Sequence, residues 1–297
     1  MASPVLSKDP ARCAYQTFLP FDKRTTNNAY QHHDCSYLPD ASRCVQAISG
    51  RNCESSGRKR ALCIGINYRA PEIVLEGCIK DVKNIRGFLM RNGYDAKDIK
   101  ILTDEEDNKP TRDNILKALS WLVEGAQSND SLFLHYSGHG GQTPDTNGDE
   151  VDQNDEDILC YDSSIIIDDE IHRILQSLPS GCQLTALFDS CHSGTILDLP
   201  YTYNCNGQYY GVTSGLNIAA NVICWSGAKD NQESADAPQG GVMTRAFIEA
   251  FEKEHNQPCK DLLHSIRIIV ERDRKDNFQI PQLGSSRPID TNSKFIL

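Results

Sequence analysis

The stretch ALCIGINY, residues 61–68, is a short apolar run that ends in polar residues. Runs of this kind are typical of strands that are buried on both faces of a parallel sheet. Residues 81–91 follow with apolar side chains at helical spacing from Val82 to Leu89, and Gly93 lies just beyond them as a stop signal. This order predicts a first strand and a crossover helix.

The same alternation of strand and helix patterns continues towards the carboxyl end. We expect strands at residues 99–102, 131–136, 183–188 and 222–226, and helices at 113–123, 168–175, about 243–251 and about 260–271. This order predicts an α/β fold with a mostly parallel central sheet flanked by helices on both faces. In such sheets, ligands and chemistry gather beyond the carboxyl ends of the strands.

The amino-terminal part of the chain has a different character. Residues 1–57 show no sustained period of 2 or 3.6, so we interpret them as an N-terminal extension of a main domain over residues 58–297. The 12 cysteines are spread over the chain, and several lie in apolar runs, as expected for buried thiols. A zinc site is an alternative for one group near the amino end, although no C-x-x-C pair is present: Cys13, Cys35, Cys44, Cys53, His32 and His33.

Charge and hydropathy exclude several classes of partner. The net charge of −11 argues against a nucleic-acid partner, because phosphate binding needs clustered Lys and Arg. No apolar run approaches the roughly 20 residues that span a bilayer, so no membrane partner is expected. The first residues, MASPVLSKDPARCAYQTF, lack a basic stretch followed by an apolar core, so they do not predict a secretory signal. A cytoplasmic location is the resulting expectation.

Two of the expected strands end in small and reactive residues. SGHGG follows SLFLHY, and DSCHSG follows LTALF, so His139 and Cys191 are expected at neighbouring strand ends. A thiol becomes a strong nucleophile when an imidazole takes its proton, and the imidazole later protonates the departing amine. The backbone N–H groups of Cys191 and Gly140 are candidates for stabilising the oxyanion. Taken singly, such a cysteine is more often a buried apolar residue, and such a histidine is more often an ordinary loop residue.

The strings LFLHYSGHGGQ and LTALFDSCHSGTILDLPY resemble the His and Cys motifs of the type I metacaspases. The resemblance extends from about residue 60 to the carboxyl end and includes EGCIKD, SGAKDNQ and RPIDTNSKFIL. Metacaspases are caspase-like cysteine peptidases that cut proteins or peptides after Arg or Lys, are usually activated by calcium and generally act as monomers. The resemblance implies a caspase-like sandwich with His139 as general base and Cys191 as nucleophile. It also implies a catalytic domain with a large part at about 58–203 and a small part at about 220–297.

Acidic residues accompany this expected pair. Asp189 lies two residues before Cys191, and Asp81 lies in EGCIKD after the first strand. Carboxylates at these places suit a cationic substrate side chain. The resemblance assigns both to the pocket that selects Arg or Lys, and it adds Cys78 and Ser137 to the lining. From the residues alone, each Asp is more often a helix cap or a solvated turn residue, Asp81 in particular.

Residues 145–157, DTNGDEVDQNDED, and the pair Asp168 and Asp169 concentrate carboxylates. Oxygen ligands of this kind suit Ca²⁺, which takes about 6–8 of them, although the run lacks the ligand spacing of an EF-hand. Taken alone, the run is more often a solvated acidic loop. The resemblance implies that four aspartates bind the activating ion, with Asp152 and Asp157 as alternatives to the first of them: Asp155, Asp168, Asp169 and Asp198.

The distribution of basic residues bears on self-cleavage. No Lys or Arg occurs between Arg173 and Lys229, so an enzyme with basic specificity does not cut between its own large and small parts. We expect the extension to cover the active cleft or brace the sheet, and it offers candidate processing points: Lys23, Arg24, Arg43, Arg51, Arg58, Lys59 and Arg60.

Two readings compete with an Arg/Lys-specific peptidase. One is a caspase-like peptidase directed at Asn or Asp, and the other is a catalytically idle caspase-fold scaffold or aggregate-binding protein. Both keep the fold, and they differ from the leading prediction in the chemistry of the site.

Overall fold

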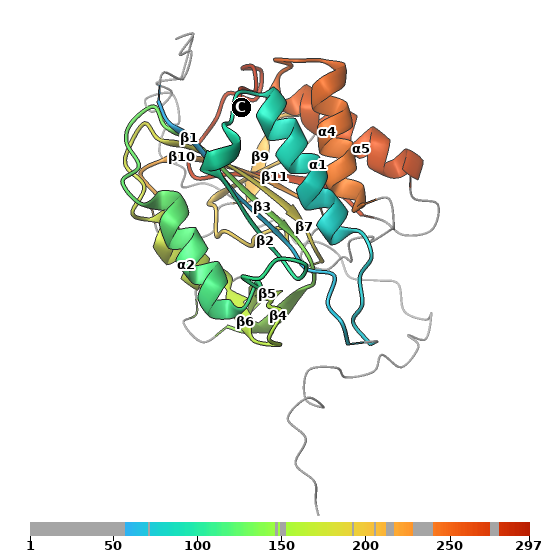
Figure 1. Cartoon of the computed structure of the whole chain (residues 1–297). Helices are drawn as coiled ribbons and strands as arrows, with labels where there is room; N and C mark the ends of the chain where they lie inside the picture. The colour runs from blue at the N-terminus through green and yellow to red at the C-terminus, as the bar shows by residue number, and fades with distance from the viewer. Residues whose placement is uncertain are drawn as a thin grey trace, which may run out of the picture. The chain divides into compact units, whose positions relative to one another are not determined.

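The computed structural model describes residues 57–70, 72–145, 148, 153–191, 193–204, 206–211, 217–227, 240–273 and 279–297 (Figure 1). The extension up to residue 56 and the alternative zinc ligands lie outside the described residues. The strands and α-helices are β1 (Lys59–Gly65), α1 (Cys78–Arg91), β2 (Ile99–Thr103), α2 (Arg112–Val123), β3 (Ser131–Ser137), β4 (Gly140–Pro144), β5 (Asn154–Leu159), β6 (Ile165–Ile167), α3 (Asp168–Leu175), β7 (Gln183–Asp189), β8 (Tyr201–Tyr203), β9 (Tyr209–Gly211), β10 (Asn221–Ser226), α4 (Val242–Lys253), α5 (Cys259–Asp273) and β11 (Gln282–Ser285).

The central sheet has eight strands in the order β2-β1-β3-β7-β10-β11-β8-β9. The strands from β2 to β10 are parallel to their neighbours, whereas β11, β8 and β9 pair in antiparallel fashion. Helices cover both faces of this sheet, with α2 on one side and α1, α4 and α5 on the other (Figure 1). The expected sandwich with a mostly parallel sheet is therefore confirmed.

Successive side chains of β1 enter different hydrophobic clusters. Leu62 and Ile64 pack in the cluster that contains apolar residues of α2 and α3, whereas Ala61 and Cys63 pack in the cluster formed with α1, α4 and α5. Because successive side chains of a strand point to opposite faces, a strand buried on both faces is apolar at every position. This explains why ALCI is continuously apolar.

The boundaries of two elements differ from the expectation in ways that position the site. β1 ends at Gly65, and the chain leaves the sheet before Tyr68, whose φ is +57°. α1 begins at Cys78, three residues before the expected start, and Cys78, Ile79 and Asp81 in its first turn are buried. Cys78 and Asp81 therefore lie one turn apart on the same side of α1.

The sequence patterns do not predict six short strands. β4, β5 and β6 form a separate three-stranded sheet, and β8, β9 and β11 extend the central sheet. All six are short, and two of them, GGQTP in β4 and NDEDIL in β5, are mainly polar. Among the residues that the structure describes, none of the helices combines the length and apolar character that crossing a bilayer requires.

The structure also bears on the candidate processing points. Lys59 and Arg60 lie in β1, which pairs with β2 on one side and β3 on the other. Cleavage after either residue would require this strand to leave the sheet. Four of the other candidates lie outside the described residues: Lys23, Arg24, Arg43 and Arg51.

Candidate active site

β3 and β7 are neighbours in the parallel sheet, and the last residues of the two strands, Ser137 and Asp189, are directly paired. His139 and Cys191 each lie two residues beyond these ends, so both leave the same edge of the sheet. The N–H of Gly138 donates to the carbonyl of Asp189 across the gap (3.4 Å). The structure therefore brings the predicted base and nucleophile to adjacent loops.

Gly140 lies against the backbone of Cys191. A Cβ atom at position 140 would collide with the Cys191 carbonyl oxygen, so the close approach of the two loops requires glycine there. Leu159 donates to the carbonyl of His139 (3.1 Å), and ladder bonds alternate along an antiparallel pair. The N–H of Gly140, in the next pair, therefore points away from β5, as a donor to an oxyanion must.

Cys191 differs from the other cysteines that the structure describes. Its side chain is partly exposed, whereas the others are buried. Burial raises the pKa of Cys63 and of Cys259 to about 12, which keeps these thiols protonated and inert. A partly exposed thiol is one that a substrate can reach.

The imidazole of His139 is oriented by a backbone carbonyl. Its Nε2 lies 2.8 Å from the carbonyl oxygen of Ile73, and a carbonyl only accepts hydrogen bonds. This contact places the proton of the neutral ring on Nε2 and leaves Nδ1 as the nitrogen that accepts a proton. Sequence reasoning missed Ile73, because any residue supplies a backbone carbonyl.

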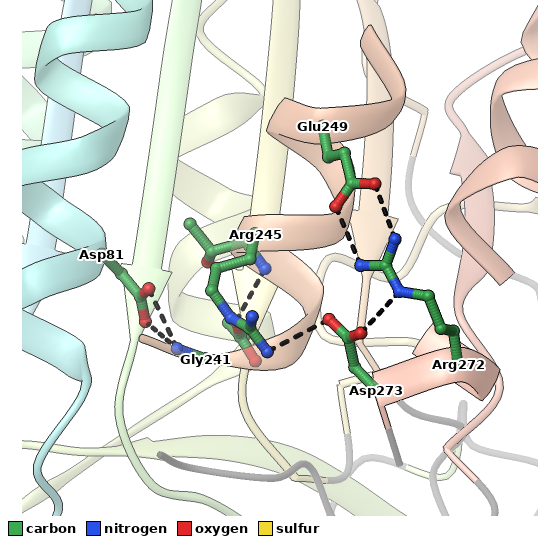
Figure 2. A network of polar contacts seen from close by, with 8 residues as sticks. Asp81, Gly241, Arg245, Glu249, Arg272 and Asp273 are labelled. Atoms are coloured by element: carbon green, nitrogen blue, oxygen red, sulfur yellow. Dashed lines mark hydrogen bonds and ion pairs between the residues drawn. The ribbon is translucent and has the colours of Figure 1, made fainter. Parts of the chain in front are cut away.

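Both predicted pocket acids are buried, with Asp81 0% and Asp189 5% exposed, and both meet the first turn of α4. The N–H of Gly241 donates to the two carboxylate oxygens of Asp81 (3.0 and 2.9 Å), as Figure 2 shows, and the N–H of Thr244 donates to Asp189 (2.8 Å). A Cβ atom at position 241 would contact both carboxylates, so they converge on one point.

Of the remaining predicted pocket residues, Ser137 contacts this group directly. The hydroxyl of Ser137 donates to Asp81 (2.8 Å), and buried Cys78 begins the helix that carries Asp81. The helix-cap alternative for Asp81 is wrong, because Gly77 is the N-cap of α1. Sequence reasoning missed Gly241 and Thr244, which are 160 and 55 residues away from the acids that they contact.

An ion-pair network fixes the first turns of α4 to the end of α5 (Figure 2). Arg245 pairs with Asp273 (3.3 Å), which also accepts from Arg272 (2.7 Å), and Arg272 donates to both oxygens of Glu249 (2.8 and 2.9 Å). The hydrogen bonds from Arg272 lower the pKa of Glu249 and of Asp273. The helix turn that contacts the pocket acids is thereby held at its outer side.

His135 in β3 is a buried histidine that the sequence did not single out. Its Nε2 lies 3.2 Å from the hydroxyl of Thr244, and its Nδ1 has no hydrogen-bond partner. Complete burial lowers the pKa of His135 to about 3, so the ring is neutral in the folded protein. His135 therefore contacts the hydroxyl of Thr244, whereas Asp189 accepts from the N–H of the same residue.

This burial predicts a loss of stability in acid. Because the folded pKa of His135 is below the unfolded value of about 6.5, the unfolded chain binds the extra proton and stability falls as the pH drops below about 6.5. From pH 7 to pH 5, the free energy of unfolding measured with urea should fall by about 2 kcal/mol more in the parent than in His135→Leu. The exposed His264→Leu serves as control and should match the parent. Equal pH dependence in the parent and His135→Leu would contradict the prediction.

The four predicted calcium ligands come from three places. Asp155 lies in β5, Asp168 and Asp169 begin α3, and Asp198 follows β7 with a φ of +49°. The carboxylate of Asp168 accepts from the N–H groups of Glu156 and Asp169 (2.8 Å each). Burial raises the pKa of Asp168 to about 8, and the charges of Glu156 and Asp155 act in the same direction.

These residues have the oxygen ligands that Ca²⁺ prefers, but their side chains are not close enough together to hold the ion. Carboxylate oxygens crowded by like charges suit a hard cation. However, the described residues contain no group of three or more His, Cys, Asp or Glu side chains that could hold a metal ion. The alternative ligand Asp152 lies outside the described residues.

Comparisons with known proteins agree with the fold and the motifs. The family model described as metacaspase, peptidase C14 domain, matches residues 59–200. Metacaspase-1 of Cryptococcus neoformans is 43% identical over 82% of this chain and 65% of its own length, and Metacaspase-1A of Neurospora crassa is 43% identical over 83% and 66%. Metacaspase-1 of Pyricularia oryzae is 42% identical over 81% of this chain and 74% of its own length. The chain thus spans slightly less than two thirds of the first two relatives.

Two solved structures share the fold. A protein from Geobacter sulfurreducens superimposes with a TM-score of 0.60 at 23% identity, covering 80% of this chain and 97% of its own. Caspase-1 from Spodoptera frugiperda gives 0.52 at 13% identity, covering 80% and 91%. With sequence identity above 40% to several metacaspases and with a caspase-like sheet, the chain belongs to the type I metacaspases.

Proposed function

We propose that this chain is a cysteine endopeptidase that cleaves proteins or peptides after Arg or Lys, with Cys191 as nucleophile and His139 as general base. The observation that carries the proposal is the common strand edge, at which a partly exposed thiol and an imidazole with its Nδ1 available meet two buried carboxylates. The metacaspase relatives give the peptidase chemistry independent support.

The proposed reaction uses these groups in turn. Nδ1 of His139 takes the proton of the Cys191 thiol, and the thiolate attacks the substrate carbonyl carbon. The N–H groups of Gly140 and Cys191 donate to the oxyanion, and the imidazolium gives its proton to the departing amine. Water then attacks the thioester, with His139 again as base, which releases the acid and restores the thiol.

The acid pair supports the proposed basic specificity. Asp81 and Asp189 are buried carboxylates that meet at Gly241, so a substrate guanidinium or ammonium entering there forms charge-assisted hydrogen bonds. Each carboxylate has about four acceptor sites, so the helix N–H groups and a cation can share it. Cys78 and Ser137 complete the proposed lining.

We also propose that Ca²⁺ binds through Asp155, Asp168, Asp169 and Asp198. The oxygen donors and the like charges around Asp168 support this, and binding would draw the four side chains together. The ion would supply positive charge that neutralises this acidic group. A monomer in the cytoplasm is part of the same proposal.

A panel of four fluorogenic peptides with Arg, Lys, Asn or Asp before the cut tests the proposal. We expect cleavage after Arg and Lys in millimolar Ca²⁺ and little cleavage with a chelator. Rates after Asp should be at least about 100-fold lower, because like charges in a buried pocket cost several kcal/mol. Rates after Asn should be similarly low, because a neutral amide offers the two carboxylates no charge-assisted hydrogen bond. Cleavage after Asn or Asp would favour the related peptidase, and no cleavage of any peptide would favour the idle scaffold. Equal rates with Ca²⁺ and chelator would remove only the calcium role.

A further inference from the structure

Two buried tyrosines hold the backbone of His139. The N–H of His139 donates to the hydroxyl of Tyr68 (3.0 Å), and the hydroxyl of Tyr136 donates to the carbonyl of His139 (2.7 Å). The two hydroxyls lie 3.2 Å apart, and that of Tyr68 donates to the carbonyl of Leu159 (2.8 Å). Both main-chain polar groups of the base are thus bound by phenols from different segments.

The tyrosines do not act as acids or bases themselves. Tyr68 is 5% and Tyr136 1% exposed, and burial raises the pKa of both hydroxyls far above the usual value. The ring of Tyr68 also packs against the imidazole, with centroids 4.8 Å apart and planes tilted by 38°. Their contacts therefore hold His139 in place and do not transfer protons.

Gly138 provides the room for this arrangement. A Cβ atom at position 138 would lie 2.6 Å from the Tyr136 hydroxyl and 3.0 Å from the Tyr68 hydroxyl. Only glycine lets the two phenols reach the neighbouring peptide groups. Glycines on both sides of His139 also make its backbone permissive, so the loop needs contacts that fix it.

We propose that Tyr68 and Tyr136 are positioning residues for His139: their hydroxyls clamp its main chain and, together with the Ile73 carbonyl, hold Nδ1 towards the Cys191 thiol. The proposal rests on the proposed peptidase function. A looser loop spends less time in the arrangement in which the thiol proton can be transferred, so the chemical step slows while the pocket that binds the basic side chain is unchanged.

Kinetics of Tyr68→Phe and Tyr136→Phe test the clamp, because each variant removes one hydroxyl and keeps the ring. With an Arg peptide, each should lower kcat about 3- to 10-fold, the effect of one hydrogen bond, and leave KM nearly unchanged. Tyr94→Phe is the matched control, since Tyr94 is also buried and shares a hydrogen bond with Ser131 (3.3 Å), a residue at the opposite end of β3. Its kcat should equal that of the parent. An equal loss of kcat in all three variants, or in none, would overturn the proposal.

A second readout does not depend on peptide cleavage. Alkylation of Cys191 by iodoacetamide, followed by mass spectrometry of the peptide that contains it, reports how well the imidazole activates the thiol. At pH 6, both clamp variants should react about 3- to 10-fold more slowly than the parent, towards the rate of His139→Ala, while Tyr94→Phe should match the parent. If the clamp variants are alkylated at the rate of the parent, the proposed role of the two tyrosines is wrong even if the parent cleaves peptides. If the clamp variants are alkylated more slowly but the parent cleaves no peptide, the clamp is supported and the peptidase function is rejected.

Discussion

Replacing Cys191 with alanine is expected to lower kcat/KM for an Arg peptide by at least about 10⁴-fold, and replacing His139 with alanine is expected to have an effect of similar size. Without the thiol no thioester forms, and without the imidazole the partly exposed thiol stays largely protonated near neutral pH. Because the two groups act as a unit, the double variant should be no worse than the poorer single variant.

Steady-state cleavage by the three variants, with unfolding curves for each, checks this expectation. The control is Cys182→Ala, since Cys182 is a buried thiol that directly precedes β7 at the end of the strand remote from Cys191. It should lose some stability and keep its activity. Full activity in Cys191→Ala would assign the nucleophile elsewhere, and a double variant far poorer than either single one would show that the residues act independently.

Most of the framework could be predicted from the sequence because its strands are buried on both faces. Continuous apolar runs marked the parallel strands of the central sheet, and α3 lies at residues 168–175 as expected. The short strands could not be found in this way. The β5 segment, NDEDIL, reads as an acidic loop, yet Asp155, Glu156 and Asp157 in it are buried. Tertiary hydrogen bonds and the neighbouring strands, rather than a local pattern, hold such a segment in place.

In the candidate site too, some groups could be predicted from the sequence and others could not. Side chains with distinctive chemistry, such as Cys191, His139 and Asp189, stand out in a sequence because few residue types can replace them. Groups that act through the backbone do not, and the Ile73 carbonyl and the Gly241 N–H became visible only when the fold brought them to His139 and Asp81. The predicted calcium ligands are the reverse case: residue types that suit the ion are present, but within the described residues they do not form a group that could hold a metal ion.

Converting both pocket acids to amides, as Asp81→Asn with Asp189→Asn, is expected to lower kcat/KM for an Arg peptide by about 10²–10⁴-fold. Each acid offers a cationic substrate a charge-assisted hydrogen bond worth about 1.5–3 kcal/mol, and the two losses together span this range. Asparagine keeps an acceptor oxygen for the N–H groups of Gly241 and Thr244, so the first turn of α4 should stay in place.

A peptide with citrulline, the neutral isostere of Arg, separates lost charge from damaged structure. The parent should strongly prefer Arg over citrulline, and the double variant should cleave the two at nearly equal rates, with citrulline cleavage close to that of the parent. Asp130→Asn is the matched control, because Asp130 is a buried carboxylate that accepts from Arg58 and Gln127 just before β3 begins. It should keep the preference for Arg. Equal losses for Arg and citrulline in the double variant would mean that the acids support the fold rather than select the substrate, and the basic specificity would then need another source.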